Sequence, residues 1–374
     1  MARPFLADPE FVNKAAQGRS SEINTCIACN QACLDHAFKA KLASCLVNPR
    51  AVHELELVIN IAPAKKRVAV IGAGPAGLAA ATTLAERGHA VHLYDSADKI
   101  GGQFNLAKRV PGKEEFEETL RYFGQRIDRT GLKLHLNTRI TAADLITGKF
   151  DEVILATGVT PRNPRIPGQD HPKVLSYIDV LLGRQPVGQR VALIGAGGIG
   201  FDVAEFLVTT HGHSTALDLP AWLAEWGVGD PSEVRGGVVH PQSTPPARQV
   251  TLLQRKPGKL GKGLGKTTGW IHRAALKMKN VEMLSGVNYE RIGAIDGEGS
   301  GLGLFITFGE KRLDGTVLAV DNIVLCAGQE PLRELLEPLR AAGIKTHLIG
   351  GADEATELDA KRAINQGTRL AAVI

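Results

Sequence analysis

Two glycine-rich turns, each set between a short apolar strand and a helix, constrain the fold of this 374-residue chain more than any other feature. The first turn spans residues 72–77 (Gly-Ala-Gly-Pro-Ala-Gly), after an expected strand at 68–71 and before an expected helix at 78–87. The second spans residues 195–200 (Gly-Ala-Gly-Gly-Ile-Gly), after a strand at 191–194. Such turns let the backbone approach a pyrophosphate, and the helix N-terminus favours its negative charge. The sequence therefore predicts an α/β chain with two Rossmann-like, three-layer dinucleotide-binding domains; a tight turn without a ligand is the alternative.

The residues that follow the next strand differ between the two turns and indicate which nucleotide each one binds. In the first unit Asp95 ends the strand at 89–94, and a carboxylate there accepts hydrogen bonds from ribose hydroxyls. In the second unit the strand at 249–254 runs into Arg255 and Lys256, whose cations attract the 2′-phosphate of NADPH. We therefore assign the first unit to FAD and the second to NADPH, with a merely solvated strand end as the alternative for the two cations.

Small residues and polar groups elsewhere complete the expected nucleotide sites. The strand at 152–156 runs towards Gly158, and small residues there let the backbone pass close to a cofactor. Near the end of the chain Gly351 and Asp353 form a turn that we expect beside the flavin, although Asp353 could instead be a helix-start residue. The nucleotide-binding candidates are Gly72, Gly74, Pro75, Ala76, Gly77, Asp95, Gly102, Gln103, Lys113, Ile140, Ala156, Gly158, Gly195, Gly197, Gly198, Gly200, Arg255, Lys256, Gly351 and Asp353.

Four of the five cysteines lie within twenty residues, in the pattern C-x2-C-x3-C-x11-C. Packing gives no reason for such crowding, so a metal centre is the leading interpretation. Three thiolates within eight residues and one more distant can hold the corners of a cubane [4Fe–4S] cluster, whereas a structural zinc site usually has two separate C-x2-C pairs. Zinc, and plain buried or disulfide-forming cysteines, are the alternatives. The metal-ligand candidates are Cys26, Cys29, Cys33 and Cys45, and we expect the fifth, Cys326, to be a core residue.

The overall composition excludes two classes of partner. The formal charge of +5 is spread along the chain without a long basic block, which is not the pattern of a nucleic-acid-binding protein. The chain has no run of eighteen apolar residues, so we expect no membrane span. Arg3, Asp8 and Glu10 interrupt the N-terminus where a signal peptide needs an apolar core. We therefore expect a cytoplasmic protein, in which thiols stay reduced and available to metal.

Breaks rich in proline and glycine divide the chain into three expected parts. Residues 1–66 hold the cysteine segment. A discontinuous FAD domain takes residues 67–165 and 330–374, and an NADPH domain takes residues 166–329. Further expected elements are helices at 9–16, 116–127, 267–279 and from residue 358, a partly helical run at 52–61, strands at 132–136, 302–308, 316–320, 321–325 and 346–349, and a hairpin turn at Asp314-Gly315.

Two glycine-rich segments have open interpretations. Residues 211–246 interrupt the second nucleotide unit, and we interpret them as a surface excursion in which Trp222 and Trp226 are packing anchors, with partner docking as the alternative. Residues 258–269 are basic and either bind phosphate or form a flexible loop.

Taken together, these motifs resemble those of bacterial NADPH-dependent 2,4-dienoyl-CoA reductases, iron–sulfur flavoproteins of the old yellow enzyme type. The resemblance spans essentially the whole chain. More distant relatives such as trimethylamine dehydrogenase share the architecture but space the cysteines differently. The resemblance rests on the cysteine pattern, both glycine turns, Gln254-Arg255-Lys256, residues 264–273 (LGKTTGWIHR) and 357–364 (ELDAKRAI), and the closing Gly350-Gly351-Ala352-Asp353.

The resemblance implies an electron relay. In that family NADPH gives a hydride to FAD, a [4Fe–4S] cluster passes electrons singly, and FMN in a TIM barrel reduces the conjugated double bonds of a fatty acyl-CoA during β-oxidation. It also implies that Gln31 touches the FMN and that Ala2 and Arg3 are the end of the barrel's phosphate site. A TIM barrel needs roughly 250 residues. We therefore expect this chain to match the carboxyl half, with a remnant of the barrel end at its start and the FMN-bearing barrel supplied in cis or in trans.

Two other functions are compatible with the same motifs. One is a reductase module for another acceptor, which would resemble the small subunit of glutamate synthase; that family has further cysteine motifs, for which this chain has no cysteines left. The other is a non-catalytic scaffold in which the cysteines bind zinc. A brown-yellow protein after preparation without air would exclude the scaffold.

Overall fold

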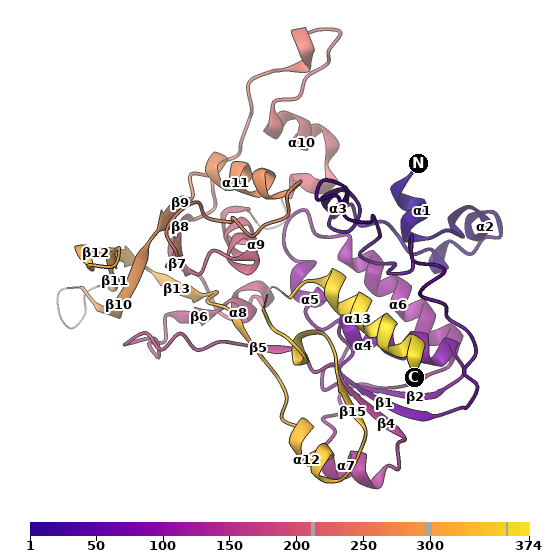
Figure 1. Ribbon diagram of the computed structural model, residues 1–374. Coiled ribbons are helices and arrows are strands. Elements are labelled where there is room, and N and C mark those ends of the chain that lie inside the picture. Colours follow the sequence, from indigo (N-terminus) through magenta and orange to yellow (C-terminus); the bar gives the residue numbers. More distant parts are fainter. Residues whose placement is uncertain (211–213, 296–300, 357) are drawn as a thin grey trace. The chain divides into compact units, whose positions relative to one another are not determined.

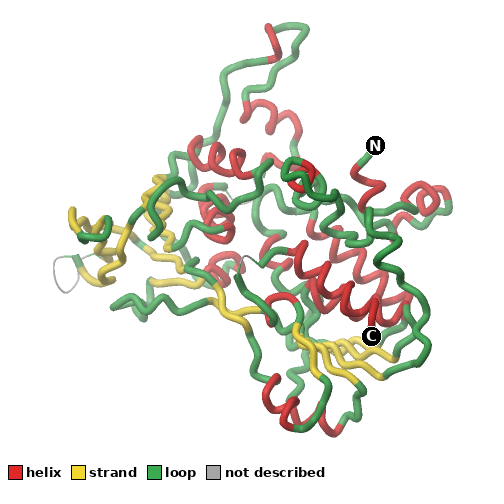
Figure 2. The backbone as a smooth tube through the Cα atoms, viewed as in Figure 1, coloured by secondary structure: helices red, strands yellow, loops and turns green. Residues whose placement is uncertain are grey.

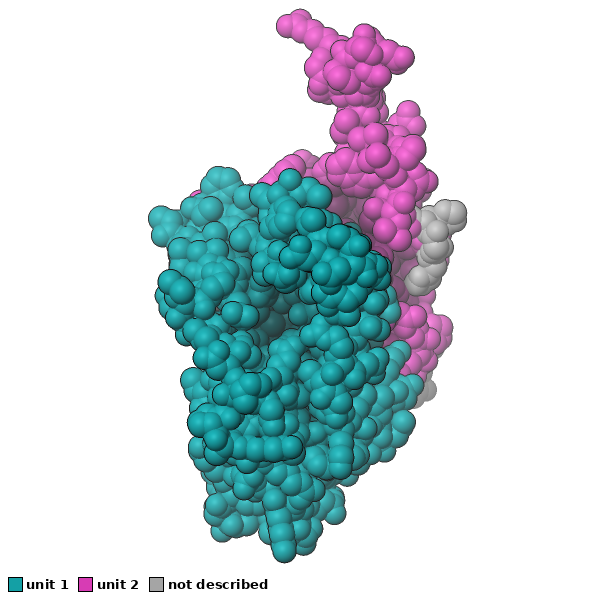
Figure 3. All heavy atoms as spheres, turned by 90° about the vertical axis from the view of Figure 1, so that its right-hand side faces the viewer, with its two compact units in different colours: residues 1–105, 115–160, 329–374 teal, residues 106–114, 161–328 magenta. Residues whose placement is uncertain are grey.

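The computed structural model describes residues 1–210, 214–295, 301–356 and 358–374. The start of the excursion, residues 211–213, and Glu357 of the family-like segment lie outside the described residues. The helices and strands are labelled in Figure 1. The chain divides into two compact units, coloured teal and magenta in Figure 3. Unit 1 comprises residues 1–105, 115–160 and 329–374, and unit 2 comprises residues 106–114 and 161–328.

Unit 1 is built on a five-stranded parallel sheet in the order β15-β4-β1-β2-β3 (Figure 2). The central strand β1 is buried except at its first residue, which explains its unbroken run of apolar side chains. The strands are β1 (Arg67–Ile71), β2 (Ala90–Tyr94), β3 (Lys133–His135), β4 (Glu152–Leu155) and β15 (Thr346–Leu348). The helices along this part of the chain are α4 (Pro75–Glu86), α5 (Phe104–Ala107), α6 (Phe116–Thr130), α7 (Ala142–Thr147), α12 (Leu336–Ala341), η4 (Gly350–Ala352) and α13 (Ala360–Val373).

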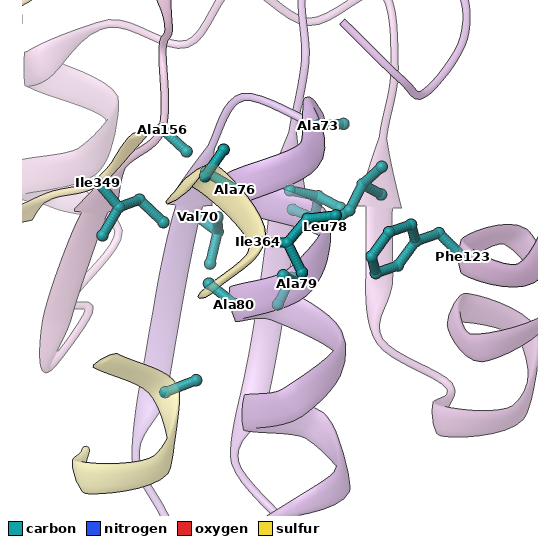
Figure 4. Close-up of a cluster of buried hydrophobic side chains, with 14 of the residues drawn as sticks. Val70, Ala73, Ala76, Leu78, Ala79, Ala80, Phe123, Ala156, Ile349 and Ile364 are labelled. Carbon is teal, nitrogen blue, oxygen red and sulfur yellow. The ribbon is translucent and has the colours of Figure 1, made fainter. Parts of the chain in front are cut away.

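The core of unit 1 lies between the sheet and the helices α4, α6 and α13. Small residues let α13 approach α4 closely, since a Cβ at Gly367 would overlap the carbonyl oxygen of Ala76. Figure 4 shows Ile364 of α13 beside Leu78 and Ala79 of α4. This packing attaches the last helix of the chain to the helix that follows the first glycine turn.

The N-terminal segment of unit 1 consists mainly of loops. It contains α1 (Arg3–Ala7), α2 (Phe11–Ala16), η1 (Ser20–Glu22) and α3 (Leu34–Ala37). The prediction of a partly helical run at 52–61 is wrong, because those residues form turns and extended backbone. Val52 has a φ of 67°, which no right-handed helix allows.

Unit 2 repeats the parallel sheet and adds an antiparallel one. The parallel sheet has the order β6-β13-β7-β8-β9, and the antiparallel sheet has the order β10-β11-β12. The parallel strands are β6 (Val174–Ser176), β7 (Arg190–Ile194), β8 (Gln249–Gln254), β9 (Glu282–Ser285) and β13 (Asn322–Leu325). The antiparallel strands are β10 (Val287–Ala294), β11 (Leu302–Phe308) and β12 (Leu313–Val320), and the helices are α8 (Tyr177–Leu182), α9 (Gly198–Val208), η2 (Thr215–Leu217), α10 (Leu219–Trp226), η3 (Arg235–Gly237) and α11 (Gly269–Met278).

The predicted α/β class with two Rossmann-like domains is confirmed, since each parallel sheet has at its centre the strand that precedes the glycine turn, β1 in unit 1 and β7 in unit 2. The short strands β5 (Val159–Pro161) and β14 (Gln329–Pro331) pair with each other. One predicted turn is wrong: β11 ends at Phe308 and the chain reverses over residues 309–312, while Asp314 and Gly315 lie inside β12. Gly309 supplies the left-handed backbone of the turn, and Asp314, with a φ of 55°, adjoins an irregularity in the pairing.

Candidate functional site

The first glycine turn is a tight crossing of backbone in which two glycines have no substitute. Gly72 has a φ of 107°, and a Cβ there would overlap the carbonyl oxygen of Ala156. A Cβ at Gly77 would overlap the carbonyl oxygen of Gly72. Gly74 begins α4 as its N-cap without a side-chain hydrogen bond. The first N–H groups of this 12-residue helix are therefore available to an anion at the turn.

Asp95 supports this turn from the end of β2. One carboxylate oxygen accepts a hydrogen bond from the Ala73 N–H at 2.7 Å, and the other accepts one from the Ala97 N–H at 2.8 Å. Behind the turn, a Cβ at Gly102 would lie 2.9 Å from the Gly74 Cα. The candidates Gly72–Gly77, Asp95 and Gly102 are thus brought together.

The closing turn of the chain lies against the same site. A Cβ at Gly351 would approach Gly158 at 3.0 Å, and a Cβ at Gly350 would approach Ala76 at 2.8 Å. Asp353 accepts a hydrogen bond from the Gln366 amide at 2.7 Å.

The interpretation of Asp353 as a helix-start residue is wrong, because α13 is capped by Asp359, whose carboxylate accepts from the Arg362 N–H at 2.7 Å. The remaining two nucleotide candidates of unit 1 are Ile140 and Gln103. Ile140 packs against the apolar cluster that contains Leu145 and Leu336, and Gln103 is half-buried before α5.

The second glycine turn repeats the first. Gly195 has a φ of 113°, and a Cβ there would overlap the carbonyl oxygen of Cys326. A Cβ at Gly200 would overlap the carbonyl oxygen of Gly195. Gly197 is the N-cap of α9, again without a side-chain hydrogen bond, and Gly198 is the first helical residue. This turn therefore also offers N–H groups at a helix start to an anion, including that of Gly198, where the first turn has Pro75 and no N–H.

The charged candidates of unit 2 lie at two places. Arg255 and Lys256 follow β8 directly and are exposed. Lys113 forms an ion pair at 2.6 Å with Asp202 of α9. Cys326 is buried in the core, as predicted, and burial raises the pKa of its thiol.

The four clustered cysteines line one small cavity together with Arg3. Left-handed backbone at Ala28 (φ 53°) and Asn30 (φ 59°) wraps the loop around Cys29. The Arg3 guanidinium donates to the Asn30 side-chain oxygen at 2.6 Å. Ala2 is exposed beside it, and the Gln31 side-chain oxygen is buried without a hydrogen-bond partner among the described residues. The four cysteines and Arg3 thus form one site, and Gln31 stands between two residues that line it, Asn30 and Ala32.

Two thiols of this site, those of Cys29 and Cys45, are disfavoured as free thiolates. Burial and the neighbouring cysteines raise the pKa of Cys29 to about 11, although the Gln31 N–H acts in the opposite direction. Burial also raises the pKa of Cys45. A metal cation removes this penalty because it stabilises the deprotonated sulfur. Within the described ranges, no three His, Cys, Asp or Glu side chains are placed to hold a metal ion.

Sequence reasoning missed the polar contacts that support the cysteine loop. Arg121 of α6 donates to the carbonyl oxygens of Ser21 and Ile23 and to the Thr25 hydroxyl, just before Cys26. The buried Asp8 accepts hydrogen bonds from Lys14 and from the Asn24 N–H. These partners are distant in sequence and have no motif, so no sequence signal could have found them.

In the part of the chain that the structure describes, no helix is long and apolar enough to cross a bilayer.

Comparison with known proteins gives a consistent set of relatives. A family model described as pyridine nucleotide-disulphide oxidoreductase matches residues 66–359. The metal reductase of Desulforamulus reducens is 32% identical over 365 residues, which cover 94% of this chain and 51% of that protein. The bilirubin reductase of Mediterraneibacter gnavus is 28% identical over 375 residues, which cover 100% of this chain and 51% of that protein.

Among solved structures, a 2-naphthoyl-CoA reductase complex superposes with a TM-score of 0.82 at 28% identity, covering 100% of this chain and 50% of that one. The chain therefore spans about half the length of the relatives it matches. These relatives support a group of flavoenzyme reductases and do not single out 2,4-dienoyl-CoA reductase, which stays a prediction.

Proposed function

Because the chain belongs to the pyridine nucleotide-disulphide oxidoreductase family, we propose that it is the NADPH-oxidising half of a longer flavoenzyme. The observation that carries the proposal is the presence, in one chain, of two matched nucleotide turns, one followed by a carboxylate and one by two cations, and of a four-thiol site. When bound, FAD would accept a hydride from NADPH, and a [4Fe–4S] cluster would pass the electrons on one at a time.

The residues of unit 1 fit FAD. The open N–H groups at the start of α4 suit its pyrophosphate, and Asp95 retains acceptor capacity for a ribose hydroxyl. Gly158, Gly351 and Asp353 lie on the adjoining turns, and nothing lies within 4 Å of a Cβ added at Gly158, which leaves room there for part of the cofactor. In unit 2, α9 offers the corresponding N–H groups to NADPH, and the exposed Arg255 and Lys256 suit the 2′-phosphate.

The cysteine site fits a polynuclear cluster better than zinc. Zinc needs four ligands at about 2.0 to 2.3 Å from one point. Here Cys26, Cys29, Cys33 and Cys45 surround a cavity, and no group among the described residues is placed for a metal ion. Iron and sulfide would fill such a space, and the chain's own N–H groups beside Cys29 and Cys45 would stabilise the negative sulfurs.

We further propose that the acceptor is an FMN-bearing TIM barrel, in cis or in trans, that reduces a 2,4-dienoyl-CoA. The relatives are about twice as long as this chain, and one neighbour is named for a reductase of a CoA thioester. Arg3 lines the cysteine cavity, and Ala2 and Gln31 are next in sequence to residues that line it, which supports assigning these three residues to the side that would face the barrel. A second candidate is a reductase for another acceptor, which is favoured by the relative named a metal reductase.

The test begins with anaerobic reconstitution of the chain with FAD, iron and sulfide. NADPH should bleach the flavin and drive ferricyanide reduction, and iron and sulfide should be bound in about equal amounts. Addition of a separately expressed barrel should allow consumption of a dienoyl-CoA, whereas ferric citrate in place of the barrel tests the second candidate. Flavin that stays yellow with excess NADPH would contradict the proposal.

A further inference from the structure

A cavity of about 600 Å³ lies in unit 1 beside the last helix of the chain. Part of its lining comes from the edge strand β15 and the residue after it, at positions 347–349. Another part is one face of α13, where the lining residues 362, 365, 366, 369 and 370 recur at helical spacing. A cavity of this volume is large enough for a small organic molecule.

The charged groups of the lining have partners with one exception. Arg362 pairs with the Glu354 carboxylate at 3.2 Å and also donates to two backbone carbonyl oxygens. His347 Nε2 lies 2.6 Å from the buried carboxylate of Glu152. Asp353 accepts from the Gln366 amide at 2.7 Å, and the proposed function assigns its remaining capacity to the flavin. None of these groups needs a further ligand.

Arg369 is the exception. Its Nε donates to the Asn365 side-chain oxygen, one helical turn earlier, at 2.9 Å, and among the described residues it forms no ion pair. The two terminal nitrogens of the guanidinium therefore remain available as a planar fork of donors. Because the Asn365 amide holds Nε, less side-chain freedom is lost when an anion binds. Such a fork suits an oxyanion, which accepts two parallel hydrogen bonds.

Apolar side chains line the same cavity. Leu348 of β15 and Leu370 of α13 both contribute to the lining and are only half-buried. A small inorganic anion at Arg369 would leave these side chains in contact with water. An organic molecule that carries the anionic group would cover them and add the free energy of apolar burial. The lining therefore favours a ligand with a charged end and an apolar body.

We propose that the cavity between β15 and α13 binds an organic oxyanion, with Arg369 holding its charged group and Leu348 and Leu370 contacting its apolar body. Arg369 lies ten residues beyond Asp359, the N-cap of α13, which is roughly 15 Å along the helix. The site is thus distinct from the glycine turns, and the inference goes beyond the proposed function because it requires neither NADPH nor a metal.

The test is isothermal titration calorimetry of the full chain, with FAD in excess and naphthalene-2-sulfonate as the probe. Wild type should bind the probe with a Kd below about 100 μM, and its uncharged sulfonamide about tenfold more weakly. Arg369→Gln should raise the Kd of the sulfonate about tenfold and leave that of the sulfonamide unchanged, because only charge-assisted hydrogen bonds are lost. Arg340→Gln removes an exposed arginine that pairs with Glu337 on α12, and it should change neither value.

A second measurement uses wild-type protein and does not depend on the folding of a variant. Phenylglyoxal modifies accessible guanidinium groups, and mass spectrometry locates the modified residues. The sulfonate at about ten times its Kd should slow modification of Arg369 about tenfold and leave that of Arg340 unchanged. Absence of sulfonate binding, an equal loss of both probes in Arg369→Gln, or an unprotected Arg369 would each overturn the inference. These measurements use no NADPH and no iron, so a failure of the proposed function is recognised separately.

Discussion

The two nucleotide units share a backbone and differ in the side chains placed at the ends of their strands. Strand pairing places Ile71 opposite Tyr94 in unit 1 and Ile194 opposite Leu253 in unit 2. In each unit an aspartate just before β4 or β13 accepts a hydrogen bond from the first N–H of the neighbouring strand β1 or β7. The distance is 2.6 Å from the Arg67 N–H to Asp151 and 2.8 Å from the Arg190 N–H to Asp321. The crossing of the glycine turn over Ala156 or Cys326 is also the same. Backbone crossings and strand-end caps are therefore the part of the architecture that the two units have in common.

The units diverge at two matched positions. The N–H of the first glycine of each turn donates to the carbonyl oxygen of Tyr94 in β2 or of Leu253 in β8, so the next residues, Asp95 and Gln254, correspond to each other. Asp95 braces its own turn, whereas the Gln254 amide donates to the Lys256 carbonyl oxygen at 2.8 Å. Because unit 2 has the neutral Gln254 in place of an acid, it lacks the carboxylate that would repel the 2′-phosphate of NADPH.

The second difference is at the first residue of β4 in unit 1 and of β13 in unit 2. Glu152 pairs with Val68, and Asn322 pairs with Val191 in the matching position. Glu152 is buried and accepts from Lys66, Lys345 and His347. Asn322 instead accepts from the Gly188 N–H and donates to the Lys173 carbonyl oxygen. Unit 1 thus uses charge where unit 2 uses a neutral amide.

The largest expected effect comes from adding a methyl group at the two equivalent turns. Gly72→Ala and Gly195→Ala should each destabilise the protein by about 3 kcal/mol or more, because a positive φ and a collision with a carbonyl oxygen combine. Gly72→Ala should abolish flavin binding. Gly195→Ala should leave the flavin bound but unreduced by NADPH. Absorbance spectra and stopped-flow reduction separate the two.

The matched control for these variants is Gly124→Ala. Gly124 lies inside α6, and nothing lies within 4 Å of an added Cβ. The substitution should be neutral or stabilising by up to about 1 kcal/mol. Loss of both nucleotides in both turn variants would show that the units are not separable as proposed.

The next effect tests the cations that replace the acid. Arg255→Ala combined with Lys256→Ala should raise the KM for NADPH about 100-fold, which is about 2.7 kcal/mol, because charge-assisted bonds to the 2′-phosphate are lost. The KM for NADH should change less than about threefold. Lys311→Ala, on the exposed turn between β11 and β12, is the control. Equal losses for both nucleotides would remove the basis for assigning the phosphate to these residues.

A smaller effect tests the buried charge of unit 1. Burial alone would raise the pKa of Glu152, but hydrogen bonds from Lys66, His347 and Lys345 outweigh it and lower that pKa to about 2. Because this is below the ordinary value of 4.5, the stabilisation is complete above pH 4.5 and is lost as the pH falls towards 2. Glu152→Gln should cost about 2 kcal/mol at pH 7 in urea unfolding and flatten the pH dependence in that window.

The counterpart substitution sharpens this prediction. Asn322→Asp should destabilise at neutral pH and recover as the pH falls, because the new carboxylate faces the Lys173 carbonyl oxygen. If stability changed with pH in the same direction in Glu152→Gln and Asn322→Asp, the two positions would not differ in their need for a charged side chain.

The sequence predicted the repeated turns because their determinants are local. A run of apolar residues followed by closely spaced glycines specifies a strand, a crossing and a helix within about twenty residues. It did not predict β9 and β10. In β10 the alternation of apolar and polar residues is interrupted between Tyr289 and Arg291, where the pairing with β11 shifts register. The hairpin was misplaced because Asp314-Gly315 has the stronger turn composition, whereas the pairing of β11 and β12 selects Gly309.

The candidate metal site likewise has residues that the sequence predicts and contacts that only the structure shows. Cys26, Cys29, Cys33 and Cys45 were found by spacing, and the structure brings them to one cavity. The contacts that support the loop, such as Asp8 to Asn24, join residues that only tertiary structure brings together. A single sequence carries no mark of such hydrogen bonds, since each partner is an ordinary polar residue.

The smallest expected effect comes from restoring the acid that unit 2 lacks. Gln254→Asp recreates the residue that Asp95 provides in unit 1 and places a negative charge beside Arg255 and Lys256. The KM for NADPH should rise about fivefold, or about 1 kcal/mol, because the new carboxylate repels the 2′-phosphate while the cations partly neutralise it. The KM for NADH should stay the same or fall. Gln254→Asn, which keeps the side chain neutral, should leave the ratio of the two KM values unchanged, so a change there would attribute the effect to the lost bond with Lys256 rather than to charge.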